Sequence, residues 1–312
     1  MISSLRNAIA GNPALAIPLL RLYGLVRAVG LRHVPGEPPK LGLRRGNQEI
    51  LLRASHYAYV ADVIHNFDYY FNAVMPSHSV DGVSVVDYST THDHVLSGSN
   101  LVMRFTALAE PDATTDIYLQ CSRLKPAATV WDLGTYCGAS TILFARTVGP
   151  GGMVYGFEPD AAKFAALNVN LDRYQCANVR VFNMAVWSRA TTLQFEAEGS
   201  MGSAAHDAGV HQRRSATRRV EAVPLDQVAS VVGQPNVDVV KMDIEGAEYT
   251  CLEAAGRPFW DLRPQMVIEP HMNNGKVNTA ALTAILRRND YNTTVLPQAG
   301  LHLPLILATP NN

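Results

Sequence analysis

The apolar positions of this chain follow two rhythms, which change near residue 127. Upstream, apolar residues recur at helical spacing over Gln48–Ala73 and predict a helix, whereas the alternating, β-branched segment Asp81–Tyr88 predicts a short strand. Thr114–Leu124 predicts a helix that leads into the second part. Downstream, apolar runs of strand length alternate with segments of helical period, which is typical of a parallel α/β sheet.

This second part predicts a regular order of elements. Strands are expected near 128–133, 153–158, 179–183, 237–243 and 265–270, and helices near 139–148, 160–174, 246–256 and 277–289. Thr192–Ala197 and Arg218–Val223 predict two more strands on either side of a Gly/Ser/His-rich loop, Gly199–Ser215. A loop of this length inside a compact domain is usually either functional or disordered. Its arginines suit either a solvated surface or the recognition of an anionic substrate.

The same pattern predicts three segments. They are a basic N-terminal helical extension over 1–45, a mixed α/β elaboration over 46–126 and the main domain over 127–312. The proline-rich Pro35–Pro39 is expected to be a linker after the N-terminal helices.

Charge is close to balanced overall but uneven along the chain. The net charge of −1 argues against general nucleic-acid binding. Residues 1–45, however, contain seven Lys or Arg and a single acid, Glu37. Polar and proline residues interrupt the apolar stretch Ala8–Leu31, so neither a membrane span nor a signal peptide is predicted. This extension suits contact with an anionic membrane surface, and equally packing on the main domain or on a second copy in a homo-oligomer.

The four cysteines are scattered, without a C-x-x-C pair or metal-ligand spacing. Reduced thiols in a cytoplasmic protein are therefore expected.

The first strand of the main domain ends in a glycine-bearing turn, Asp132–Gly138. Glycines in a strand-to-helix turn let a ligand approach the backbone N–H groups at the helix start. A dinucleotide loop spaces its glycines G-x-G-x-x-G, but here the order is G-x-x-x-G behind an acid. This spacing favours a ligand with an amino-acid end, S-adenosylmethionine (SAM). The cofactor-binding candidates in the turn are Asp132, Gly134, Thr135, Tyr136 and Gly138.

A second acid follows at the distance expected for a ribose contact. Glu158 ends the predicted strand 153–158, and both oxygens of its carboxylate can accept hydrogen bonds from ribose hydroxyls. The alternative is an acid that merely favours the start of the next helix. Asn183, after the third strand, is placed to bond the adenine edge or a ribose, or else to end the strand.

Acids and a histidine follow the last two parallel strands. Lys241-Met242-Asp243-Ile244-Glu245 and Glu269-Pro270-His271 are expected at the same edge of the sheet, where ligands of open α/β sheets bind. Asp243 suits the cofactor's ammonium group or a substrate proton. We predict His271, Asp243 and Glu245 as catalytic residues, with histidine suited to general-base work. A hard divalent cation would suit the same groups, but we assign no metal ligand from the sequence.

Together these motifs resemble the FkbM-type SAM-dependent methyltransferase family. The resemblance spans roughly residues 127–307 and is carried by WDLGTYCGAS (131–140), GFEPD (156–160), NMAV (183–186), VKMDIEGAEYTCLEAA (240–255) and VIEPH (267–271). It implies a class I methyltransferase (Rossmann-like) fold, a seven-stranded, mostly parallel sheet that ends in an antiparallel hairpin. Tyr291–Leu296 and Leu301–Leu307 suit that hairpin. Thr135-Tyr136 departs from the family's Ala-Asn.

The resemblance implies O-methylation of a hydroxyl on a sugar, glycolipid or polyketide-type metabolite, so the expected partner is a small-molecule, glycan or lipid acceptor. Two alternatives stay open on the sequence. They are an NAD-dependent oxidoreductase on a similar sheet, and a non-catalytic module that binds SAM or a partner.

Overall fold

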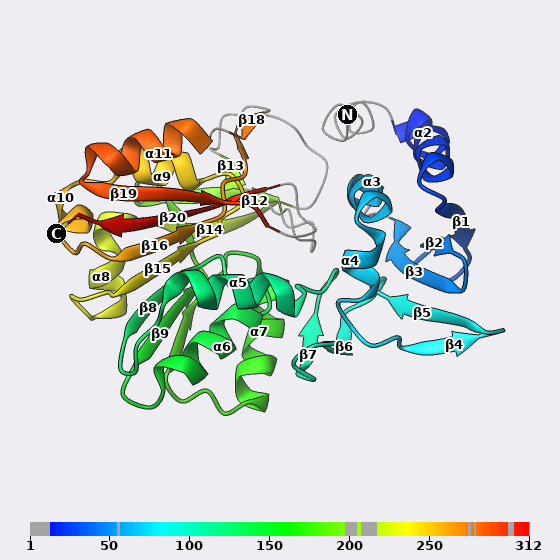
Figure 1. Cartoon of the computed structure of the whole chain (residues 1–312), viewed down its shortest axis with the longest axis horizontal. Helices are drawn as coiled ribbons and strands as arrows, with labels where there is room; N and C mark the ends of the chain where they lie inside the picture. Colours follow the sequence, from blue (N-terminus) through cyan, green and yellow to red (C-terminus); the bar gives the residue numbers. More distant parts are fainter. Residues whose placement is uncertain are drawn as a thin grey trace. The chain divides into compact units, whose positions relative to one another are not determined.

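The computed structural model divides the chain into two compact units, Met1–Asp112 and Ala113–Asn312 (Figure 1). The structure describes residues 13–54, 57–196, 205–206, 217–273, 276–277, 279–298 and 303–311.

The N-terminal unit is built on a five-stranded sheet with the order β1-β2-β3-β5-β4. Its only parallel pair among the described strands is β3 with β5. A separate hairpin, β6–β7, and three helices complete the described part of this unit. The elements are α2 (Pro13–Val26), β1 (Gly30–Val34), β2 (Lys40–Arg45), β3 (Gln48–Arg53), α3 (Tyr57–His65), α4 (Phe67–Phe71), β4 (His78–Val80), β5 (Val83–Asp87), β6 (His92–Val95) and β7 (Val102–Phe105).

Three predictions for this half were wrong in part. The helical extension over 1–45 is helical only in α2 among its described residues, and Pro35–Pro39 is the turn between β1 and β2. The helix predicted over Gln48–Ala73 begins as β3, because its run Ile50-Leu51-Leu52 is buried between β2 and β5. A short, fully buried apolar run does not distinguish a strand from a helix by its period.

The second unit begins earlier than residue 127. Its first helix, α5 (Asp112–Ser122), buries Tyr118 and Cys121 against the strands of the large sheet. The boundary between the units therefore precedes this helix rather than following it.

The second unit contains a seven-stranded sheet with the order β10-β9-β8-β15-β16-β20-β19. Neighbours are parallel except where β20 pairs with β16 and β19, so the predicted C-terminal antiparallel hairpin is confirmed. The predicted class I methyltransferase fold is present. The strands are β8 (Thr129–Leu133), β9 (Met153–Phe157), β10 (Val179–Phe182), β15 (Val239–Met242), β16 (Gln265–Ile268), β19 (Tyr291–Leu296) and β20 (Leu305–Pro310).

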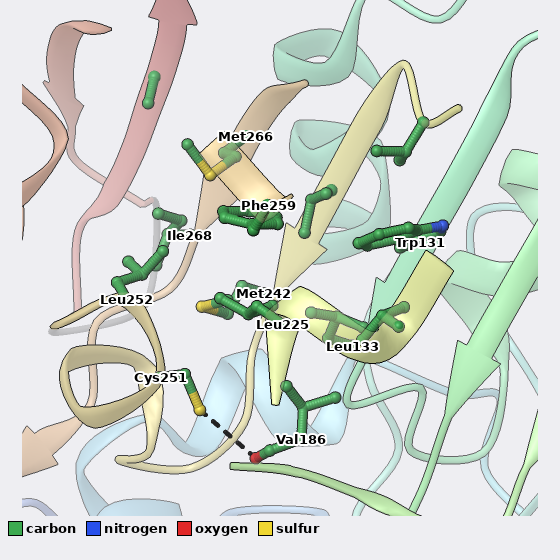
Figure 2. Packing of buried hydrophobic residues seen from close by; sticks show 14 of the residues in the cluster. Trp131, Leu133, Val186, Leu225, Met242, Cys251, Leu252, Phe259, Met266 and Ile268 are labelled. Atoms are coloured by element: carbon green, nitrogen blue, oxygen red, sulfur yellow. Dashed lines mark hydrogen bonds between the residues drawn. The ribbon is translucent and has the colours of Figure 1, made fainter. Parts of the chain in front are cut away.

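Helices cover both faces of this sheet, which is why its central strands are apolar without alternation. On one face, α5 and α6 (Ala139–Val148) pack on side chains such as Val130, Val154 and Val239. On the other face, Trp131, Leu133, Met242 and Ile268 pack against helices α8 to α11 (Figure 2). These helices are α8 (Leu225–Val232), α9 (Glu248–Ala254), α10 (Arg257–Trp260) and α11 (Thr279–Arg288).

After β10 the chain departs from the strand–helix alternation. A second sheet with the order β11-β14-β12-β13 follows, in which β12 and β14 are antiparallel. Except for Ala205 and His206, the predicted loop Gly199–Ser215 lies outside the described residues. The remaining elements are α7 (Ala161–Arg173), β11 (Ala185–Trp187), β12 (Thr191–Glu196), β13 (Ala205–His206), β14 (Thr217–Pro224), β17 (Met272–Asn273) and β18 (Lys276–Val277).

The strand order determines where a ligand can enter the sheet. The chain runs from β8 outward through β9 to β10, and then returns to place β15 on the other side of β8. The loops after β8 and β15 therefore leave the carboxyl edge in opposite directions. In open α/β sheets this reversal marks the ligand-binding crevice.

Candidate active site

The glycine turn after β8 is shaped by a close approach to the loop after β15. Gly134 has a φ of +82°, and a Cβ atom there would lie 1.7 Å from the backbone oxygen of Asp243. Gly138 is the N-cap of α6 in the left-handed conformation, with a φ of +93° and no side-chain cap. Any side chain at Gly134 would force the two loops apart. The glycines therefore bring the start of α6 and the Asp243 loop to one place at the sheet edge.

Asp132 and Lys241 form a buried ion pair beneath this turn. The two residues are register partners in the parallel β8–β15 pair. The Lys241 Nζ lies 3.3 Å from Asp132 Oδ1 and 3.3 Å from Asp243 Oδ2, and it donates to the Gly134 carbonyl at 2.6 Å. Asp132 Oδ2 accepts from the hydroxyls of Ser140 and Thr141 at 3.1 and 2.6 Å. Asp132, predicted to bind the cofactor, thus holds the turn and the first turn of α6 from below.

Glu158 reaches the turn from the end of β9. Its two carboxylate oxygens accept separately from the backbone N–H groups of Tyr136, at 3.0 Å, and Asp160, at 2.8 Å. Burial raises the pKa of Glu158 to about 7, although Lys163 opposes the shift. Each oxygen retains one lone pair for a hydroxyl donor. Asp160, rather than Glu158, caps helix α7. The alternative interpretation of Glu158 as a helix-start acid therefore has less support.

The remaining cofactor candidates lie around Glu158. The side-chain hydroxyl of Thr135 is fully buried and has no hydrogen-bond partner among the described residues. Tyr136 has a φ of +51°, and its ring lies 5.2 Å from Lys163 Nζ. Asn183 is exposed, and its amide donates to the carbonyls of Glu158 and Pro159 at 2.8 and 3.1 Å. Asn183 therefore holds the Glu158 turn in place through its NH₂ group.

The residues after β15 and β16 form a group that we call the acid–imidazole cluster. His271 Nδ1 lies 2.9 Å from Glu248 Oε1, while its Nε2 faces the carboxylates of Asp243, Glu245 and Glu269 at 3.6, 3.8 and 3.9 Å. Backbone N–H groups of Ile244 and Gly246 hold the Glu248 carboxylate. The imidazole is therefore oriented from one side and surrounded by carboxylates on the other. The predicted catalytic set His271, Asp243 and Glu245 is brought together. The cluster consists of Asp243, Glu245, Glu248, Glu269 and His271.

Tyr118 completes the cluster from helix α5 and was not predicted. Its hydroxyl is buried, 2.6 Å from Glu269 Oε2 and 3.2 Å from Asp243 Oδ2. A single O–H group can donate to one of these carboxylates at a time. Tyr118 precedes the first motif and is separated from Asp243 by 125 residues. Its position on a buried helix face is the only signal that the sequence contains.

Electrostatics divide the cluster into groups with different protonation. Burial alone would raise the pKa of Asp243, but Lys241 and His271 outweigh it and hold that pKa below its ordinary value. Burial raises the pKa of Glu245 to about 7, with His271 opposing and Asp243 reinforcing the shift. Burial would lower the pKa of His271, but Glu245 and Glu248 raise it well above its usual range. Near neutral pH the imidazole is therefore a cation, and Glu245 is the group poised to exchange a proton.

The same atoms are close enough to share a cation. Among the described residues, one ligand atom from each of Asp243, Glu245 and His271 lies within 4.8 Å of the others. Carboxylate oxygens and an imidazole nitrogen are acceptable ligands for Mg²⁺, Mn²⁺ or Zn²⁺. The geometry thus permits either proton transfer or cation binding.

Comparison with known proteins decides the family. Residues 132–293 match the family model described as the methyltransferase FkbM domain, which is just over half of the chain. The chain belongs to the FkbM methyltransferase family. The resemblance drawn from the sequence is confirmed, and the enzyme is a methyltransferase with SAM as its cofactor. Membership of this family rules out the alternative of an NAD-dependent oxidoreductase.

Three solved structures are similar to this FkbM methyltransferase chain. An FkbM methyltransferase from Methylobacillus flagellatus KT shares 16% identity, with 82% of this chain and 55% of that chain covered and a TM-score of 0.44. A precorrin-6y C5,15-methyltransferase from Geobacter metallireducens GS-15 shares 13% identity, with 64% and 90% covered and a TM-score of 0.42. A SAM-dependent O-methyltransferase from Thermotoga maritima shares 11% identity, with 65% and 67% covered and a TM-score of 0.40.

The chain spans about half the length of the Methylobacillus FkbM structure. No curated protein matches the chain.

The residues present in the FkbM methyltransferase domain fit SAM. The buried Thr135 hydroxyl without a partner, the start of α6 without a side-chain cap and the carboxylate of Glu158 all meet at the glycine turn. Backbone N–H groups at a helix start suit the carboxylate of an amino acid, and Glu158 suits ribose hydroxyls. The acid–imidazole cluster carries four carboxylates, which suit a ligand with cationic groups.

Proposed function

We propose that the enzyme transfers the methyl group of SAM to a hydroxyl oxygen of a sugar, glycolipid or polyketide-type acceptor. The supporting observation is the contact between Gly134 and the Asp243 backbone, which brings the cofactor turn against the acid–imidazole cluster. An ionisable pair able to take a proton therefore lies directly beside the predicted methyl donor. The hydroxyl acceptor rests on the resemblance to the family, and the proton-accepting pair is consistent with it.

The cofactor supplies an activated methyl group on a sulfonium sulfur, so the protein's tasks are positioning and proton transfer. Glu158 and the start of α6 would hold the ribose and amino-acid ends. Lys241 fixes the turn through the Gly134 carbonyl and fixes Asp243 through its carboxylate. Both contacts orient groups and neither requires Lys241 to change its protonation.

Glu245 is the best proton acceptor in the cluster. Its pKa of about 7 matches neutral pH, and its side chain is 30% exposed, so an acceptor molecule can reach it. Asp243 is a weaker base because its pKa lies below the ordinary value. His271 holds its own proton near neutrality and serves as the positive charge that keeps Glu245 ionisable. The proton of the acceptor hydroxyl therefore passes to Glu245, and from there to solvent.

Tyr118 and Glu248 position the reacting groups without meeting the acceptor. Glu248 fixes the imidazole ring through Nδ1, and the Tyr118 hydroxyl contacts the carboxylates of Glu269 and Asp243. Such partners determine the orientation and basicity of the groups that they hold.

The proposal is tested by incubating the enzyme and SAM with a panel of hydroxylated glycans, glycolipids and polyketides. We expect S-adenosylhomocysteine to form together with a methyl ether on one class of acceptor, detected by mass spectrometry. Glu245→Gln should retain SAM binding by calorimetry and lose turnover by roughly 10²-fold or more. Glu221→Gln, an exposed acid on β14, is the matched control. Cofactor binding without turnover on any hydroxyl acceptor would favour a binding module.

A further inference from the structure

Helix α2 of the N-terminal unit is apolar on two opposite faces. One face packs inward, because Leu20 is fully buried and Gly24 lies beside Ile64 of α3. The Tyr23 hydroxyl, 2.8 Å from His65 Nδ1, fixes this packing. The helix is therefore attached to its unit without using its other face.

The opposite face exposes three large aliphatic side chains. Leu22, Leu25 and Val26 are 61%, 75% and 77% exposed. At 3.6 residues per turn they lie within an arc of about 100°, opposite Leu20 and Gly24. Other large exposed aliphatic side chains of the described residues occur singly, as with Val80 and Val102. Isolated exposed aliphatic residues are ordinary, but a contiguous stripe marks an interaction surface.

The charge around this stripe indicates the kind of partner. The first 36 residues contain no Asp or Glu, and their arginines include Arg21 and Arg27. Arg21 is exposed beside Leu25 at one edge of the stripe, whereas Arg27, also exposed, follows the helix on the side of Leu20. Arg27 also donates to the His65 carbonyl at 2.9 Å, which keeps it at the end of the helix. An aliphatic stripe with an exposed arginine at its edge, in a segment without acids, complements an anionic lipid surface.

None of the described helices combines the length and apolar character that a membrane span needs. With 14 residues, α2 suits a position in the plane of the interface.

We propose that α2 docks the enzyme on anionic membrane surfaces, with Leu22, Leu25 and Val26 inserted among the lipids and Arg21 on the headgroups. This inference does not depend on the methyl acceptor. Vesicle binding requires neither cofactor nor substrate, so its failure and the failure of the proposed function are separate results.

The test is co-sedimentation of the full chain with phosphatidylcholine vesicles, with and without phosphatidylglycerol, at low and high salt. We expect binding only with the anionic lipid, weakened by salt. The triple variant L22S/L25S/V26S should bind at least about tenfold more weakly, and Arg21→Glu about fivefold or more. The matched control is V80S/V102S, which removes two exposed aliphatic side chains from strands of the same unit.

Circular dichroism and SAM calorimetry establish that each variant is folded. If the triple variant does not fold, Arg21→Glu tests the same surface. Absence of vesicle binding by the wild-type protein would overturn the proposal, as would equal binding by the triple variant and the control. A dimer in analytical ultracentrifugation that the triple variant dissociates would overturn it too, because a second copy would then cover the stripe.

Discussion

Replacing His271 should raise the pKa of Glu245, and this change tests the central assignment of the active site. The imidazolium Nε2 lies 3.8 Å from Glu245 Oε2 and stabilises the charged carboxylate. At an effective dielectric constant of about 20 this attraction is about 4 kcal/mol, and in bulk water it is about 1 kcal/mol. Because the Glu245 side chain is 30% exposed, the lower part of that range applies.

His271→Gln should therefore raise the Glu245 pKa from about 7 to at least about 8. The sign follows from charge, because loss of a cation disfavours the carboxylate. The acidic limb of the rate profile reports ionisation of the base, so activity should still rise with pH but over a more alkaline range.

Carbon-13 NMR of glutamate-labelled protein measures this pKa without a known acceptor. The Glu245 signal is assigned by its disappearance in Glu245→Gln. His78→Gln, an exposed histidine of the N-terminal unit, is the matched control and should leave the titration unchanged. A Glu245 pKa that stays the same or falls in His271→Gln would refute the charge coupling. A wild-type value near the ordinary 4.5 would refute Glu245 as the base.

Three further predictions concern the cofactor turn and the cluster. Glu158→Gln should weaken SAM binding at least about tenfold, because one ribose acceptor becomes a donor. The affinity of the wild-type protein for SAM should rise as pH increases through about 7, where Glu158 ionises. A calorimetric affinity that does not change with pH would contradict this. Gly134→Ala should abolish SAM binding and lower the melting temperature, because its Cβ would lie 1.7 Å from the Asp243 oxygen; near-wild-type melting and affinity would mean that the loops are not in contact. Dialysis against EDTA should leave turnover intact, because Glu245 accepts the proton and His271 remains its charged partner, whereas loss of activity restored by Mg²⁺ would make them ligands instead.

Features determined by short-range spacing were predictable from the sequence. Gly134 and Glu158 each follow a strand at the distance that a Rossmann-like sheet imposes, and the structure brings both to one turn. The convergence of Asp243, Glu245 and His271 was also predictable, because adjacent parallel strands end at the same edge. What the spacing could not give was the role of each group. Asp132 and Asn183 lie in the predicted place, but their contacts hold the turns from behind.

Features that depend on packing across the chain were not predictable. Tyr118 enters the cluster only because α5 lies on the face of the sheet formed by β8 and β15. Its 11-residue helix gives no local sign of a polar contact at a strand end. The strand β3 was mistaken for a helix for a related reason. Its burial between β2 and β5 makes Ile50-Leu51-Leu52 continuously apolar and removes the alternation that identifies a half-buried strand.

Lys241 connects the two halves of the active site. The residue is 1% exposed, and its ammonium group contacts Asp132, Asp243 and the Gly134 carbonyl. A buried charge is costly unless it is paired, and these three acceptors offset that cost only in one arrangement of the two loops. Lys241 therefore holds the cofactor turn in position and, together with His271, keeps Asp243 ionised. A change in either loop must alter the electrostatics of the other, which couples cofactor binding to the protonation of the acid–imidazole cluster.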